Sequence, residues 1–164
     1  MTDYQEHSDR KEMEKLVNEL TYQRYLMNEG QIRNFFKKMS IPEYIALHII
    51  ASDLEEEEIC SGKTYLKNLA GKMRLTIQQI SKMVEKLADQ GLVLWQHDGD
   101  GREGTYVTIT ETGKKLLCEQ QTVLKEYYGN VMKKFGKENL YRLLELMKQL
   151  ENVMSDEFMS MEEK

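Results

Sequence analysis

A chain of 164 residues has the size of one domain, or of one domain with an appended element, and it needs no disulfide or metal to build a core. Its longest uninterrupted apolar runs are four residues, which excludes a membrane-spanning helix, and residues 1–15 lack the apolar stretch of a secretory signal. Two cysteines, Cys60 and Cys118, make neither a disulfide framework nor a metal knuckle, so we expect reduced thiols in a cytoplasmic protein.

The net charge of −5 is unevenly distributed along the chain. Residues 1–60 carry 7 basic and 13 acidic side chains, a net of −6, and residues 116–164 carry 7 and 9, a net of −2. Residues 61–115 carry 9 basic and 6 acidic side chains, a net of +3. Only the docking face of a DNA-binding protein must attract phosphate, so the basic middle third is consistent with a compact DNA-reading segment.

Two helices are predicted before this basic segment. Apolar residues recur at mostly helical spacing over residues 8–38, which predicts a long helix with Gly30 as a possible break. Ser40 is a capping residue and Pro42 suits a first helical turn, so a second helix is expected to start there. The acidic run at residues 55–58 ends that helix and is expected to be solvated.

Two shorter helices are predicted after a turn at residues 61–62. The first starts at Thr64, and its inward positions are Leu66, Leu69, Ala70 and Met73. The second starts at Thr76 and is stopped by Gly91, because glycine favours the C-terminal end of a helix. Its apolar stripe, at intervals of three and four, consists of Ile77, Ile80, Val84 and Leu87.

A β-hairpin is predicted directly after these helices. Residues 92–95 predict a strand, and the Asp-Gly pairs at residues 98–101 predict a tight turn. Residues 105–109 predict the returning strand, with the alternation of a half-buried edge. Helix, turn, helix, strand, turn and strand is the order of a winged helix-turn-helix, a mainly α fold with a small β-hairpin wing.

Long amphipathic helices flank this unit on both sides. From Thr110 the chain is expected to be helical, with a break at Gly136. The broad apolar faces favour packing against a second copy in a two-fold dimer, and an intramolecular bundle in a monomer is the alternative. We therefore expect an N-terminal dimerisation helix over 1–40, a DNA-binding domain over 41–113 and C-terminal dimerisation helices over 114–164.

The second helix of a helix-turn-helix enters the major groove of double-stranded DNA, and Thr76 would cap it there and present N–H groups to a phosphate. Glutamine can pair with adenine and lysine can reach guanine. The candidates on its polar face are Gln78, Gln79, Ser81, Lys82 and Lys86. Phosphate contacts are expected from Lys63, Thr64, Lys67 and Lys72, and a minor-groove contact from Arg102. The alternative is an ordinary solvated helix face.

Five segments occur in a set order: YLKNLA at 65–70, LTIQQISK at 75–82, VEKLADQGLV at 84–93, DGR at 100–102 and ITETG at 109–113. Together they resemble the MarR family of bacterial transcriptional regulators over residues 40–117. The resemblance implies a homodimer that binds a roughly palindromic operator, usually as a repressor and often released by a small anionic or phenolic ligand.

The same resemblance implies roles for individual residues. The matches to base-reading positions are Gln78, Gln79, Ser81 and Lys82, and Arg102 matches the wing arginine that Asp100 would orient through an ion pair. The chain departs from the family at Trp95 and Gln96, where a basic residue is usual, and at Gly101. Because the wing has one cation, its phosphate affinity is expected to be lower.

Other residues give weaker indications. One hypothesis is a pliable ligand cleft lined by Tyr25, Tyr44 and His48, whereas the competing interpretation packs His48 in the core. The three histidines lie in different elements, so we expect no metal and no cofactor. Cys60 follows four glutamates, which disfavours the thiolate that redox sensing needs.

Two classes of function remain open. No nucleophile–base pair and no phosphate-binding glycine loop is apparent, so an enzyme is the least favoured class. The first hypothesis is a dimeric, ligand-responsive DNA-binding regulator. The second is a winged-helix protein-interaction module that no longer reads DNA, favoured by the acidic total and the single wing cation.

Overall fold

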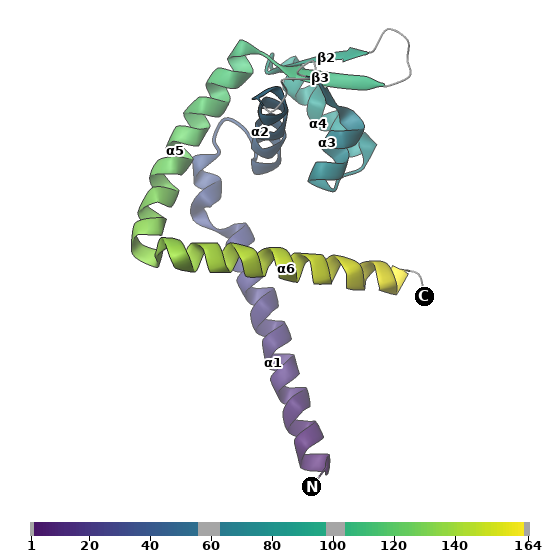
Figure 1. Ribbon diagram of the computed structural model, residues 1–164, viewed down its shortest axis with the longest axis vertical. Coiled ribbons are helices and arrows are strands. Elements are labelled where there is room, and N and C mark those ends of the chain that lie inside the picture. The colour runs from purple at the N-terminus through teal and green to yellow at the C-terminus, as the bar shows by residue number, and fades with distance from the viewer. Residues whose placement is uncertain (1, 56–62, 98–103, 163–164) are drawn as a thin grey trace. The chain divides into compact units, whose positions relative to one another are not determined.

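The computed structural model describes residues 2–55, 63–97 and 104–162, and the chain forms two compact units, Met1–Leu117 and Cys118–Lys164 (Figure 1). The elements in chain order are α1 (Thr2–Glu29), the 3₁₀ helix η1 (Gln31–Phe35), α2 (Ile41–Glu55), β1 (Thr64–Tyr65), α3 (Leu66–Met73), α4 (Ile77–Asp89), β2 (Val93–His97), β3 (Thr105–Ile109), α5 (Glu111–Phe135) and α6 (Lys137–Glu162).

The core of the first unit lies where α2, α3 and α4 pack on a small sheet (Figure 1). Each helix contributes residues three or four positions apart, so that one stripe of each faces the sheet. The side chains that are at most 2% exposed include Leu47, Ile50, Leu69, Ile80, Val84, Leu87, Val93 and Val107. This packing makes α3 and α4 a helix-turn-helix supported from behind by the sheet.

The sheet has three antiparallel strands in the order β1-β3-β2. Strands β2 and β3 form the predicted hairpin, in which Trp95 lies opposite Val107. On the other side of β3, Thr64 lies opposite Val107 and Tyr65 opposite Tyr106. The prediction that the returning strand is an edge strand is therefore wrong, because the two-residue β1 pairs with its free side.

The helix boundaries largely follow the predicted breaks. Glycine ends α1, which stops at Glu29 directly before Gly30. In the remainder of the predicted first helix, residues 31–35 form a 3₁₀ helix and residues 36–38 are not helical. Gly136 has φ 94° and separates α5 from α6, a left-handed conformation that glycine adopts without strain. The prediction that Ile77 belongs to the buried stripe is wrong: it is 50% exposed, because it is the first residue of α4 and lies before the part that packs on the core.

The long flanking helices expose their apolar residues. Over 9–28 of α1 and 141–162 of α6, every side chain is exposed. The large apolar side chains among them include Leu16, Val17, Tyr25, Leu143, Leu146, Leu150, Val153 and Phe158. Within the ranges that the structure describes, no helix combines the length and the apolar character needed to cross a membrane.

Candidate nucleic-acid interface

The N-terminus of α4 is closed by a reciprocal capping box, which confirms Thr76 as its capping residue. The Thr76 hydroxyl oxygen accepts a hydrogen bond from the Gln79 backbone N–H at 3.2 Å, and the Thr76 backbone N–H donates to Gln79 Oε1 at 2.9 Å. The side-chain oxygen of Gln79 is therefore occupied by the helix itself. Bidentate pairing with adenine, which uses that oxygen, would require Gln79 to release the cap.

The two faces of α4 have opposite character. Ile80, Val84 and Leu87 are 0% exposed and hold one face against the core. Gln78 and Lys82 lie on the other face and are exposed. Ser81 is half-buried at the boundary between the two faces. Except at Ile77, the sequence predicted this division correctly, because the apolar residues three and four apart had to share one side.

The cations expected on the phosphate backbone have different surroundings. Lys67 and Lys72 are exposed on α3. Lys63 lies over the Tyr106 ring, with its Nζ 4.5 Å from the ring centroid. Thr64 is 1% exposed, because its pairing with β3 turns it into the core, so the prediction that it contacts DNA is wrong.

Lys86 is also on α4, but its ammonium is paired within the protein. Its Nζ lies 2.6 Å from Oε1 of Glu43, a side chain in the first turn of α2. The other oxygen, Glu43 Oε2, accepts a hydrogen bond from the Ser40 backbone N–H at 2.6 Å. Burial acts to raise the pKa of Glu43, but the hydrogen bonds from Lys86 and Ser40 outweigh it and hold that pKa below its ordinary value.

Glu43 is absent from the residues predicted for the site, although the sequence carries a signal for it. Serine followed three residues later by glutamate, as in Ser40 and Glu43, is the pattern of a capping box at a helix start. The Glu43 backbone N–H donates to the Ser40 hydroxyl at 3.4 Å, which completes the reciprocal arrangement. The ion pair to Lys86 could not be read from the sequence, because the two residues belong to different helices that are distant along the chain.

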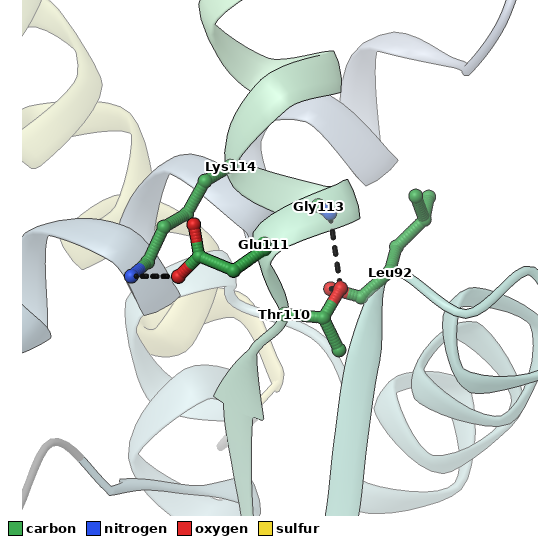
Figure 2. Close-up of polar contacts among 5 residues, drawn as sticks. All are labelled: Leu92, Thr110, Glu111, Gly113 and Lys114. Atoms are coloured by element: carbon green, nitrogen blue, oxygen red, sulfur yellow. Dashed lines mark hydrogen bonds and ion pairs between the residues drawn. The ribbon is translucent and has the colours of Figure 1, made fainter.

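The base of the wing is tied to the first turn of α5, as Figure 2 shows. Thr110 caps α5, because its hydroxyl oxygen accepts from the Gly113 N–H at 3.0 Å, and the same hydroxyl donates to the Gly91 carbonyl at 2.7 Å. A Cβ on Gly113 would lie 2.1 Å from the Leu92 carbonyl oxygen. The hydrogen bonds of Thr110 explain the first threonine of the ITETG segment, and the close approach of Leu92 explains its glycine. Asp100 and Arg102, the predicted wing residues, lie outside the described residues.

The residues predicted to line a ligand cleft are only partly brought together. Tyr44 lies between Phe36 and His48, with ring centroids 5.4 and 6.2 Å apart respectively, whereas Tyr25 is 60% exposed on α1. His48 is exposed and its Nδ1 lies 3.4 Å from the Ser52 hydroxyl, so the interpretation that packs it in the core is wrong. A cavity of about 330 Å³ lies beside this cluster, and its lining comprises Arg33, Phe36, Ser40, Ile41 and Pro42.

Metal binding gains no support from the described residues. Among them, no group of three or more His, Cys, Asp or Glu side chains could hold a metal ion. Cys118 is a free and exposed cysteine on α5, and Cys60 lies outside the described residues.

No protein-family model matches the sequence, and no curated protein sequence matches it either. Solved structures do match. A MarR family regulator from Neisseria meningitidis is 22% identical, with a TM-score of 0.68 over 87% of this chain and 96% of that one. A mutant MarR from E. coli complexed with operator DNA is 15% identical, with a TM-score of 0.64 over 82% and 92%. NadR in complex with 4-hydroxyphenylacetate is 17% identical, with a TM-score of 0.62 over 85% and 96%.

The architecture thus belongs to the winged helix-turn-helix class, with a three-stranded sheet behind α3 and α4 and long helices before and after them in the chain. More narrowly, this is the winged-helix fold of the MarR family regulators, with which the chain aligns over most of its length.

Proposed function

We propose that this chain is a sequence-specific, double-stranded DNA-binding transcriptional regulator of the MarR type. The observation that carries the proposal is the exposed face of α4. A capped helix, held by its apolar side against the sheet, presents Gln78 and Lys82 outward, where a major groove could receive them. The likeness to a MarR complexed with operator DNA supports this placement.

The protein acts on DNA as a homodimer in this proposal. A helix-turn-helix dimer reads two half-sites about one helical turn apart, so the operator is roughly palindromic. The exposed apolar side chains of α1 and α6 support the dimer, because monomeric proteins rarely leave so much apolar helix surface uncovered. The roles expected above for Lys67, Ser81, Arg102 and Asp100 belong to this arrangement.

A small anionic or phenolic effector releases the protein from its operator, which makes it a repressor. The likeness to NadR in complex with 4-hydroxyphenylacetate supports an effector of this chemistry. Within the described residues, the cavity beside Phe36 has a volume typical of small-ligand sites, and Arg33 is the cation in its lining. Tyr44 packs against the Phe36 ring, so Phe36 would lie between Tyr44 and a ligand in the cavity.

Binding to a random-sequence duplex of about 30 base pairs, measured by fluorescence anisotropy over a series of salt concentrations, tests the proposal. Each phosphate contact contributes about −0.9 to the slope of log K against log salt. Wild-type protein should show a steep slope. Lys82→Ala should make the slope shallower by about 0.9, the contribution of one phosphate contact. Lys148→Ala removes the same charge from α6 and should leave the slope unchanged.

The alternative is a winged-helix protein-interaction module. The net charge of −5 favours it, since a net negative charge repels phosphate at long range. A module of this kind would show almost no duplex binding at moderate salt, and Lys82→Ala would then change nothing. That pair of results would replace the regulator with the module.

A further inference from the structure

We propose that Lys86 is a positioning residue, which holds the recognition helix α4 to Glu43 of α2 and does not bind a DNA phosphate. This inference rests on the proposed function and deepens it. It separates Lys86 from Lys82, which lies one turn earlier on the same helix and carries the same charge. Sequence alone treats the two lysines as equivalent members of one polar face.

The geometry of the pair is asymmetric. The Lys86 side chain is 61% exposed, whereas the Glu43 side chain is 7% exposed. Both carboxylate oxygens of Glu43 are engaged, one by Lys86 Nζ at 2.6 Å and the other by the Ser40 N–H at 2.6 Å. The carboxylate is thus fixed by the first turn of α2, and Lys86 reaches it from the last turn of α4.

The electrostatics favour keeping this pair in the DNA complex. A DNA phosphate could attract Lys86 as strongly as the Glu43 carboxylate does. If Lys86 moved from Glu43 to a phosphate, however, Glu43 would stay buried without its cation. An unpaired buried charge is strongly destabilising, whereas an exposed lysine loses little by staying where it is. Lys82 has no such obligation, because among the described residues it makes no ion pair and is exposed.

The consequence is a helix held at both of its ends. The capping box at Thr76 defines where α4 begins, and the Lys86–Glu43 pair fastens its last turn to α2. Gln78 and Lys82 lie between these two points on the exposed face. A change at Lys86 should therefore alter how α4 is presented to DNA without removing a contact to DNA.

The test uses full-length protein and the duplex that the wild-type protein selects from a random pool. Lys86→Met should weaken binding by about tenfold, while the salt slope stays within about 0.3 of the wild-type value. Glu43→Gln keeps an acceptor for Ser40 but removes the charge. Added to Lys86→Met, it should restore much of the lost affinity, because the unpaired carboxylate is gone. Lys82→Met is the matched control and should reduce the magnitude of the salt slope by about 0.9.

Each result decides the matter. The inference is wrong, and Lys86 binds phosphate, if two results are found together. Lys86→Met would reduce the magnitude of the salt slope by about 0.9, as Lys82→Met does, and adding Glu43→Gln would not restore the lost affinity. If Lys86→Met alone is unfolded in circular dichroism, the double variant carries the measurement. Failure of the wild-type protein to bind any duplex would overturn the proposed function, and this role for Lys86 with it.

Discussion

The side chain of Gln79 caps α4, and this limits the contacts that it could make with DNA. Its side-chain oxygen accepts the Thr76 N–H, so only its amide N–H groups are available to a base in this conformation. Gln79→Ala should relax base preference without abolishing binding, and should cost about 0.5–1 kcal/mol of unfolding free energy through the lost cap. Selection from random duplexes measures the first effect and thermal unfolding the second.

Two further variants separate the roles of Gln79. Gln79→Glu retains the acceptor for Thr76, so it should keep the stability while losing the amide donor to bases. Gln78→Ala touches no cap, and it should alter base preference with no loss of stability. Full retention of sequence preference in Gln79→Ala would show that the recognition face is misplaced on α4.

Gly113 is required where α5 starts beside the wing. A Cβ there would meet the Leu92 carbonyl oxygen at 2.1 Å and the Ile109 side chain at 2.8 Å, and a backbone atom cannot move aside cheaply. Gly113→Ala should destabilise the fold by about 1–3 kcal/mol, measured by denaturant unfolding. Gly71→Ala is the control, because a Cβ on Gly71 would meet nothing within 4 Å, and it should stabilise α3 by about 0.5–1 kcal/mol.

At the scale of elements, the tie between α2 and α4 makes stability depend on pH. The pKa of Glu43 is lowered from its ordinary value of 4.5 in the folded protein. Its contribution is therefore fully present above that value and is lost as the pH falls through the lower, folded-state pKa. Glu43→Gln should cost about 1 kcal/mol at pH 7, and the difference from wild type should shrink in acid.

Thermal unfolding across a pH series checks this expectation. Glu85→Gln provides the control, because Glu85 is exposed on the same helix as Lys86 and should leave the pH profile as it is in the wild type. A constant difference between Glu43→Gln and wild type at every pH would mean that the carboxylate charge plays no part.

Elements with a periodic apolar pattern over many residues could be predicted from the sequence. Elements that form only by pairing with a distant segment could not. The stripe of α4 and the breaks at Gly30, Gly91 and Gly136 were predictable, because helical spacing and glycine act locally. Strand β1 was not, because two residues carry no period and Thr64–Tyr65 become a strand only by pairing with β3.

The candidate site divides in the same way. The outward position of Gln78 and Lys82 follows from the stripe behind them, and both were predicted. The occupied oxygen of Gln79 has a local signal, because a threonine followed three residues later by a glutamine is the pattern of a capping box. The pairing of Lys86 with Glu43 has none, because it joins two helices that are distant along the chain. Sequence reasoning found the face but could not assign a separate task to each residue on it.

At the scale of the whole molecule, the exposed apolar side chains of α1 and α6 support the proposed homodimer. We expect a particle of twice the 19.4 kDa chain mass in light scattering after size exclusion. Leu150→Lys places a charge in the apolar stripe of α6 and should shift the mass toward the monomer, because burying an unpaired charge is costly.

Asn152→Lys is the control for this experiment, since it adds the same charge two positions along α6, on the side of the helix opposite Leu150. It should leave the particle mass unchanged. A wild-type mass of 19.4 kDa at all concentrations would contradict the dimer and favour the intramolecular bundle for the flanking helices.

The decisive experiment for a DNA-reading α4 is selection of bound duplexes from a random pool at about 100 mM salt, where specific and non-specific binding separate. We expect recovery of an inverted repeat with half-sites about one helical turn apart, the spacing of two recognition helices in a dimer. Absence of any enriched sequence, with protein that is folded and dimeric, would show that α4 does not read DNA.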